Sequence, residues 1–185
     1  PWVCISPCTP SVINNLDNSW GKLWGMDLKL NSRHDAHNLV AGIEYQNNFR
    51  QDQQFYDVDP YWLYLDDKRS NTREALYVQD EIKLRENLLF NAGLRYDHFS
   101  TTGNSVNPRL ALIYHVRPAT ALKFLYGTAF RAPTAYELYY VSSSLKSNLD
   151  LKPEEITSHE FVIEHQFQPD FRLTASAYYN EISNL

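Results

Sequence analysis

Hydrophobic and polar residues alternate along most of this chain, in segments of about ten residues that are each followed by a break. The clearest segment places Phe90, Ala92, Leu94 and Tyr96 in one row and Asn91, Gly93, Arg95 and Asp97 in the other. A period of two residues is typical of a β-strand with one apolar and one polar face. The sequence therefore predicts an all-β protein.

Eight strands are expected, near residues 20–30, 39–46, 74–84, 90–97, 109–116, 122–129, 156–167 and 172–182. The connections between them are residues 31–37, 50–71, 85–87, 100–107, 117–120, 131–155 and 168–170, and short connections alternate with longer ones. Outer-membrane barrels combine short periplasmic turns with longer extracellular loops, whereas a soluble β-sandwich has no reason to sort its connections by length. We therefore expect part of an antiparallel transmembrane β-barrel, with the turns at 117–120 and 168–170 on the periplasmic side.

The composition supports this fold class. Aromatic residues make up 14% of the chain, yet only 43% of residues are hydrophobic and the mean hydropathy is −0.48. The longest apolar run, at residues 110–114, is far shorter than the roughly 18 residues that a membrane-spanning helix needs. The net charge of −5 argues against a nucleic-acid partner, which would require a basic surface.

Five sequence signatures, in order along the chain, resemble the barrel of TonB-dependent outer-membrane receptors. They are Leu76-Tyr77-Val78-Gln79-Asp80-Glu81, Gly93-Leu94-Arg95-Tyr96-Asp97, Asn107-Pro108-Arg109-Leu110, Phe130-Arg131-Ala132-Pro133-Thr134 with the following Glu137-Leu138-Tyr139, and Asn148-Leu149-Asp150-Leu151-Lys152-Pro153-Glu154 leading into Ser158-His159-Glu160-Phe161. Each signature falls on a predicted strand or at the edge of a predicted loop. The resemblance covers residues 38–185.

The resemblance implies a receptor in the outer membrane of a Gram-negative bacterium that takes up a ferric siderophore or a cobalamin-like chelate with energy derived from TonB. Its implied partners are outer-membrane lipid, a plug domain, the remaining strands of a barrel of about 22 strands, and TonB, which the family contacts through its N-terminal part. No plug region and no terminal barrel strand are recognisable. We therefore expect an irregular segment at residues 1–19 and a partial barrel domain at residues 20–185.

Two alternatives stay open on the sequence alone. One is a passive porin or a small closed outer-membrane barrel, and the other is a soluble carbohydrate-binding β protein or a barrel enzyme. The chain contains no nucleophile elbow, phosphate loop or hydrolase-like His–carboxylate motif, so we expect no enzyme, no catalytic residues and no cofactor. His34 and His37 indicate solvated turn residues rather than a metal site, and Cys4 and Cys8 could pair in an oxidising compartment.

Aromatic residues concentrate in the two longest connections. The candidates for ligand contact are Tyr56, Tyr61, Trp62, Tyr64, Tyr136, Tyr139 and Tyr140. Flat aromatic rings on external loops suit iron chelates, corrinoids or sugars, although such rings can also mark the membrane interface. Their number favours a siderophore over vitamin B12.

Charged residues on the polar rows give a second set of candidates. Glu44, Arg95, Asp97 and Arg109 are expected to face the lumen and to contact a plug. We interpret them as a charge network that fixes the shape of the barrel rather than as ligand contacts. Pro108 and Pro133 lack an amide donor and are therefore expected at strand ends and loop entries.

Overall fold

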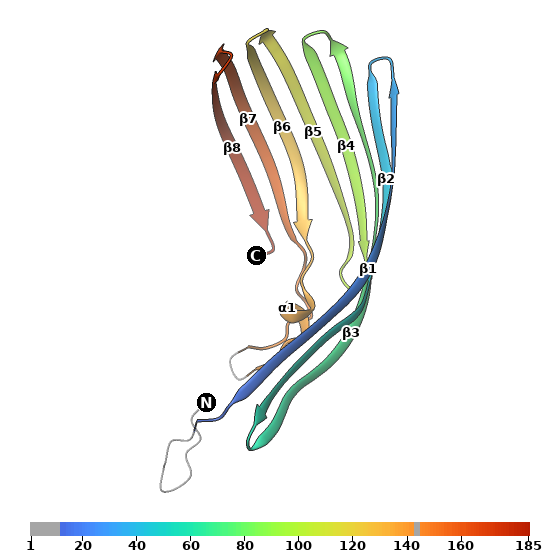
Figure 1. Ribbon diagram of the computed structural model, residues 1–185, viewed down its shortest axis with the longest axis vertical. Helices are drawn as coiled ribbons and strands as arrows, with labels where there is room; N and C mark the ends of the chain where they lie inside the picture. Colours follow the sequence, from blue (N-terminus) through green and yellow to red (C-terminus); the bar gives the residue numbers. More distant parts are fainter. Residues whose placement is uncertain (1–11, 143–144) are drawn as a thin grey trace. The chain divides into compact units, whose positions relative to one another are not determined.

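A computed structural model describes residues 12–142 and 145–185, which form eight strands and one short helix (Figure 1). The strands are β1 (Asn15–His34), β2 (His37–Val58), β3 (Tyr61–Arg85), β4 (Leu88–Phe99), β5 (Gly103–Arg117), β6 (Thr120–Arg131), β7 (Glu154–Gln168) and β8 (Phe171–Ser183), and the helix is α1 (Ala135–Tyr139). All eight strands belong to one sheet in the order β1-β2-β3-β4-β5-β6-β7-β8, so the predicted pairing of sequence neighbours is confirmed. No helix among the described residues is long and apolar enough to cross a membrane.

The chain divides into two compact units. The sheet unit consists of Gly25–Gln46, Thr72–Ala132 and Lys152–Leu185. The hairpin unit consists of Asn47–Asn71, the described residues up to Trp24 and the described residues of Pro133–Leu151. Strands β1, β2 and β3 pass through both units, which we describe separately.

The short turns of the sheet unit lie at one end of the strands. Three of these turns are each joined to the next strand by one backbone hydrogen bond of 2.8 Å. The bonds run from Lys83 N on β3 to Ala36 O, from His115 N on β5 to Asn87 O, and from Gln166 N on β7 to Ala119 O. The turns at 118–119 and 169–170 are therefore at the same end, as predicted. The chain leaves the sheet unit toward residues 50–71 at the opposite end of β2, which also agrees with the predicted topology.

Several predicted boundaries were wrong. Strand β1 begins at Asn15 rather than near residue 20, and β5 begins at Gly103, so the connection predicted at 100–107 shrinks. The predicted long loop at 50–71 is mostly a β-hairpin, because β2 continues to Val58 and β3 starts at Tyr61. Polar residues occupy both rows in these segments, so the sequence shows no hydrophobic period of two. The backbone nevertheless pairs as a strand, which is why the prediction missed it.

The two prolines behave differently. Pro133 follows the end of β6 at Arg131, as expected for a residue without an amide donor. Pro108 lies inside β5 and pairs with Leu94 on β4, so its predicted place at a strand end was wrong. The ladder between β5 and β6 begins one residue later, at Arg109, so Pro108 still marks the end of pairing on one side of the strand.

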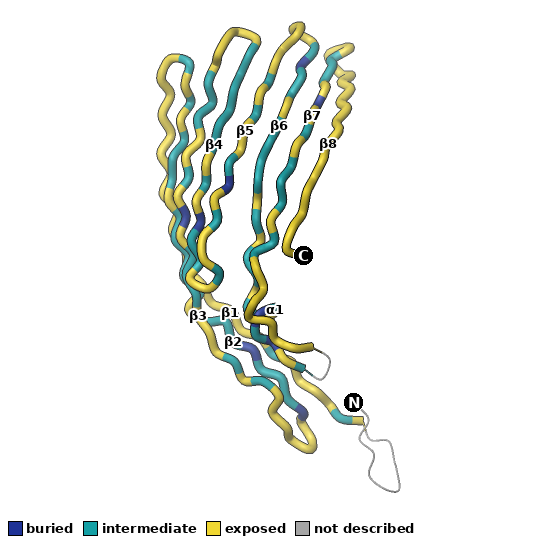
Figure 2. Tube along the Cα trace, turned by 180° about the vertical axis from the view of Figure 1, so that it is seen from behind, coloured by how far each residue is buried: buried dark blue, intermediate teal, exposed yellow. Residues whose placement is uncertain are grey.

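The two faces of the sheet unit differ as the alternating pattern predicts. Large apolar side chains remain exposed along one row of each strand, among them Leu28, Leu76, Val78, Leu94 and Phe124. Figure 2 shows buried positions on β4 and β5. The buried residues of these two strands are polar: Asp97 exposes only 2% of its surface and Asn107 exposes 6%. No large side chain among the described residues is fully buried. A sheet with apolar groups outward and polar groups shielded suits a wall between lipid and a wet lumen.

Gly42 and Tyr77 form a close cross-strand contact between β2 and β3. A Cβ atom added at Gly42 would overlap the Cζ and Oη atoms of the Tyr77 ring. Tyr77 pairs with Arg95 on β4, whose guanidinium carbon lies 5.7 Å from the ring centroid. The missing side chain at Gly42 therefore leaves the space that the aromatic ring fills.

Gly42→Ala is expected to lower the free energy of unfolding of the complete receptor by about 1–3 kcal/mol, because the Tyr77 ring must move away from its place beside Arg95. Gly93→Ala is the matched control, since its Cβ would lie at an ordinary 3.5 Å from Gln79. Thermal unfolding in detergent, followed by circular dichroism, measures both variants. Equal loss of stability in the two would contradict the role assigned to this contact.

Candidate functional site

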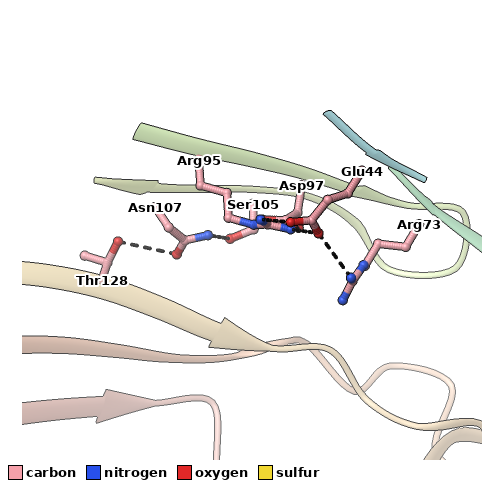
Figure 3. Close-up of polar contacts among 7 residues, drawn as sticks. All are labelled: Glu44, Arg73, Arg95, Asp97, Ser105, Asn107 and Thr128. Carbon is pink, nitrogen blue, oxygen red and sulfur yellow. Dashed lines mark hydrogen bonds and ion pairs between the residues drawn. The ribbon is translucent and has the colours of Figure 1, made fainter. Parts of the chain in front are cut away.

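A band of polar side chains crosses the shielded face of the sheet unit. This polar band consists of Glu44, Arg73, Arg95, Asp97, Ser105, Asn107 and Thr128, which come from five consecutive strands (Figure 3). Glu44, Arg95 and Asp97 come from polar rows predicted from the sequence, whereas Arg73, Ser105 and Asn107 lie outside the strands predicted there and Thr128 is on the same row of β6 as Phe124. The band contains three of the four residues that we expected to face the lumen.

Arg95 is the centre of the charged half of the polar band. Its Nη1 and Nη2 atoms donate to the two carboxylate oxygens of Glu44 at 2.8 and 2.7 Å, a bidentate geometry. Its Nε and Nη2 atoms donate to Asp97 at 2.8 and 2.9 Å. Arg73 adds a longer contact to Glu44 at 3.3 Å. One guanidinium thus satisfies two carboxylates on two different strands.

A small residue makes this bridge possible. Glu44 lies on β2 and Arg95 on β4, so β3 runs between them. On β3, Ala75 stands opposite Asp97 and is 3% exposed. A methyl group at that position leaves room for the guanidinium to reach across the strand, which a longer side chain would obstruct.

The uncharged half of the polar band continues onto β5 and β6. Asn107 is buried, donates to Ser105 Oγ at 3.0 Å and accepts from Thr128 Oγ1 at 3.4 Å. Arg109 does not join the band: it is exposed, it lies opposite Gly93 and Gly127, and it has no ion-pair partner within the part of the chain that the structure describes. The structure thus brings Glu44, Arg95 and Asp97 together and leaves Arg109 apart.

The hairpin unit contains an aromatic cluster formed by Phe55, Tyr64, Tyr136 and Tyr140. Phe55 stacks on Tyr64 with ring centroids 4.9 Å apart, and Tyr136 stacks on Tyr140 at 4.3 Å. A tilted contact of 6.1 Å between Phe55 and Tyr140 joins the two stacks. Residues about 80 positions apart in the sequence are therefore packed against one another.

Carboxylates hold the tyrosines of the aromatic cluster in place. The Tyr140 hydroxyl donates to Asp17 Oδ2 at 2.7 Å, and the Tyr64 hydroxyl donates to Asp57 Oδ2 at 2.5 Å. Asn15 donates to the other oxygen of Asp57, which is only 4% exposed. Burial and the bond to Asp17 raise the pKa of Tyr140, and the bond to Asp57 and burial raise that of Tyr64, so both phenols stay protonated donors.

Helix α1 orients the second stack. Thr134 caps the helix: its Oγ1 accepts from Glu137 N at 3.2 Å, while Glu137 Oε2 accepts from Thr134 N at 2.8 Å. This reciprocal pair satisfies two amides that a helix start leaves open. Tyr139, also on α1, lies under the guanidinium of Arg69 on β3, whose carbon is 3.3 Å from the ring centroid.

The predicted ligand-contact residues divide by exposure. Tyr61, Trp62 and Tyr136 expose 50% or more of their surface, whereas Tyr140 exposes 6%. Tyr56 packs against Tyr61 with centroids 5.7 Å apart. Tyr61, Trp62 and Tyr136 therefore offer rings to solvent, Tyr64 is 37% exposed, and Tyr140 is the buried member, stacked against Tyr136.

Sequence reasoning missed several residues of these two sites, among them Ser105, Asn107 and Thr128 of the polar band and Phe55 of the aromatic cluster. Asp17 falls in the segment predicted to be irregular, and Arg69 and Arg73 fall in or beside the predicted loop at 50–71. Gln53, on the same row of β2 as Phe55 and Asp57, is 6% exposed, and its Oε1 has no hydrogen-bond partner in the described structure. The aromatic residues on either side of Asp59 and Pro60 are the signal that could have revealed a hairpin.

No group of three or more His, Cys, Asp or Glu side chains in residues 12–142 and 145–185 is arranged to hold a metal ion. His37 contacts Asp80 at 2.6 Å, and His34 contacts Asp35 at 3.3 Å in the adjacent turn. Cys4 and Cys8, whose pairing the sequence leaves open, lie outside the described residues.

Comparison with known proteins agrees with this geometry. Residues 9–185 match the family model for the TonB dependent receptor-like β-barrel. The iron-regulated outer membrane virulence protein of Vibrio cholerae is 28% identical over 62% of this chain, and the vitamin B12 transporter BtuB of the same species is 32% identical over 63%. The siderophore receptor PirA from Pseudomonas aeruginosa has the same fold, with a TM-score of 0.72, 24% identity, and 86% of this chain and 31% of that chain covered.

An open antiparallel sheet with exposed apolar rows on one face and a polar band on the other is a section of an outer-membrane β-barrel wall. The chain belongs to the TonB-dependent receptor family and is an outer-membrane protein of a Gram-negative bacterium. It spans about a fifth of the length of the curated relatives it matches, 19% and 18% for the two Vibrio proteins. Those relatives are named for transport and iron regulation rather than for an enzymatic activity.

Proposed function

We propose that this chain forms part of the barrel wall and an external hairpin of a receptor that imports a scarce chelate, a ferric siderophore or a cobalamin-like compound, with energy derived from TonB. The observation that carries this proposal is the aromatic cluster, in which Tyr136 exposes 50% of its surface and the Tyr64 and Tyr140 hydroxyls bond to the carboxylates of Asp57 and Asp17. Rigid aromatic groups provide contact area at a low cost in conformational entropy. Of the proteins compared above, BtuB is named as a vitamin B12 transporter and PirA as a siderophore receptor, which supports the same class of ligand.

The polar band has a different role in this proposal. Glu44, Arg95 and Asp97 would hold neighbouring strands in register and, together with Arg109, present charge to a plug domain. Strands β1 and β8 are exposed almost throughout, and in hydrocarbon each unpaired backbone group costs several kcal/mol (Figure 2). Further strands of the same receptor would satisfy those groups. Family membership disfavours the alternatives of a passive porin and of a soluble β protein.

Uptake by cells tests the proposed function. The complete receptor gene is expressed in a strain that lacks its own chelate receptors, with the tonB gene intact or deleted, and uptake of radiolabelled ferric siderophores and cobalamin is measured. We expect uptake of one of these ligands only when tonB is intact. Equal uptake without tonB would support a passive porin, and no uptake of any chelate would contradict the proposal.

Trp62→Ala is expected to weaken ligand binding by the complete receptor about tenfold or more, because an exposed ring at the centre of a contact surface dominates its binding energy. Tyr114→Ala, which removes an exposed ring on β5 in the sheet unit, is the matched control and should leave affinity unchanged. Isothermal titration calorimetry in detergent measures both. A Trp62→Ala receptor with native affinity would show that the hairpin aromatics do not contact the ligand.

A further inference from the structure

The hairpin of β3 and β4 ends in an irregularity beside its short turn, at the end of the sheet unit where the short turns lie (Figure 1). Lys83, on the polar row, pairs with Leu89. The register then shifts by one residue, and Arg85 pairs with Leu88, which continues the apolar row of β4 toward the turn. Directly paired residues of an antiparallel sheet share a face. This β-bulge therefore moves Arg85 from the polar row to the apolar row.

The hairpin of β5 and β6 repeats this arrangement. His115, on the polar row, pairs with Ala121. After the same shift of one residue, Arg117 pairs with Thr120, and Thr120 pairs in turn with His165 on the apolar row of β7. Two bulges at the same end of the sheet unit thus place an arginine on the face that carries the exposed apolar side chains.

Aromatic rings mark the boundary of the apolar band at this end. Tyr114 lies on the apolar row of β5, and Phe167 and Phe171 lie on either side of the turn between β7 and β8, with ring centroids 5.4 Å apart. All three rings are exposed. Barrel walls carry such rings where the apolar band meets the lipid head groups. Arg85 and Arg117 are exposed and are the last residues of their strands, so they lie at the level of the head groups.

No carboxylate neutralises either guanidinium. The side chains of Arg85 and Arg117 have no hydrogen-bond or ion-pair partner within residues 12–142 and 145–185. Glu86, the carboxylate next to Arg85 in the sequence, pairs instead with Lys83 at 2.8 Å. Two free cations at a membrane boundary attract anions from the lipid surface.

We propose that Arg85 and Arg117 bind the phosphate of an anionic phospholipid in the leaflet on the side of the short turns. A guanidinium matches the geometry of a phosphate with two parallel hydrogen bonds. The exposed ring of Tyr114, on the same face, would lie along the upper part of an acyl chain. This site is on the outer surface of the barrel wall, so it goes beyond the proposed uptake function and does not depend on it.

Lipid binding by the complete receptor tests this inference. Phosphatidylglycerol, which is anionic, and phosphatidylcholine with the same acyl chains, which is zwitterionic, are titrated separately into labelled receptor in detergent micelles, and affinity is measured by microscale thermophoresis. Phosphatidylglycerol should bind about tenfold tighter or more, because each of the two cations adds to the attraction of an anionic lipid. Equal affinities for the two lipids would overturn the inference. Displacement of phosphatidylglycerol by inorganic phosphate at millimolar concentration would indicate a site for free phosphate and would overturn the assignment to lipid.

Substitution of the two arginines tests the site itself. The double variant Arg85→Gln, Arg117→Gln should bind phosphatidylglycerol about tenfold more weakly or worse than the unaltered receptor. The matched control is the double variant Lys83→Gln, Arg172→Gln, which removes two cations from the same end of the sheet unit but from the polar row. It should stay within about threefold of the unaltered receptor, because exposed charges more than about 8 Å apart are largely screened at physiological salt.

Heat-modifiable electrophoretic mobility checks that the double variants fold. If the double arginine variant does not fold, the single variants Arg85→Gln and Arg117→Gln replace it, and each should weaken binding of phosphatidylglycerol by about threefold or more. Equal affinities of the arginine variant and the control, or native affinity in both single variants, would overturn the site.

Discussion

Arg95→Met is expected to destabilise the complete receptor by about 3–5 kcal/mol, the range for removing one partner of a buried ion pair. Asp97 exposes 2% of its surface and receives two hydrogen bonds from Arg95. Without the guanidinium, Asp97 and Glu44 would both lose a charged partner on the shielded face of the sheet. The methionine chain keeps a similar length, so the loss reports on charge rather than on volume.

Arg109→Met is the matched control for this prediction. Arg109 lies on the same row of the sheet, on the neighbouring strand β5, but it is exposed and has no ion-pair partner in the described part of the chain. Its loss should change the free energy of unfolding by no more than about 0.5 kcal/mol. Urea unfolding in detergent, followed by the loss of the folded band on gels, compares the two variants. Similar midpoints for both would show that the Arg95 contacts do not stabilise the barrel.

The sequence was sufficient to predict where the strands of the sheet unit lie. The alternation through Phe90, Ala92, Leu94 and Tyr96 is strict, and β4 occupies Leu88–Phe99. In lipid, one row must be apolar, so the period of two persists wherever a strand crosses the membrane. The same constraint explains why the turns at 86–87, 118–119 and 169–170 were located within one residue, whereas the connection predicted at 31–37 shortens to 35–36 because β1 continues to His34.

The hairpin could not be predicted by the same rule. Around Asp52 and Gln54 on β2, and Asp66 and Lys68 on β3, both rows carry polar groups, so hydrophobic periodicity gives no information about backbone pairing. The strands still form because backbone pairing and cross-strand aromatic contacts, such as Phe55 with Tyr64, stabilise them. A composition rich in Tyr and Trp around an Asp-Pro turn was the remaining indication.

The candidate sites were predicted in part for a related reason. Alternation placed Glu44, Arg95 and Asp97 on one face, and the structure shows them in contact. The register between strands decides which residues meet, and a period of two leaves that register open. This is why Arg109 was included although it stands apart, whereas Arg73 was omitted because it lies one residue before the strand predicted at 74–84.

Leu94→Arg is expected to impair assembly of the complete receptor far more than Gly93→Arg. Leu94 is in the middle of β4, on the apolar row, and is 49% exposed. A charge on the lipid-facing row costs about 2–4 kcal/mol near the midplane of a barrel and less near the interfaces. Leu94 stands between Ala92 and Tyr96 on the apolar row of β4. The new arginine side chain would therefore have only apolar neighbours on its own strand and would point toward lipid.

Gly93→Arg introduces the same side chain one residue away on the polar row. An added Cβ there would meet Gln79 and Val78 at an ordinary 3.5 Å, so the backbone tolerates a side chain. The new guanidinium would stand opposite the exposed Arg109, and two like charges on neighbouring strands repel each other by less than about 1 kcal/mol. Folding yield into detergent micelles or lipid vesicles, measured by heat-modifiable mobility, compares the two variants with the unaltered receptor. Equal yields would show that Leu94 does not face lipid, and a lower yield for Gly93→Arg would reverse the assignment of the two faces of the sheet.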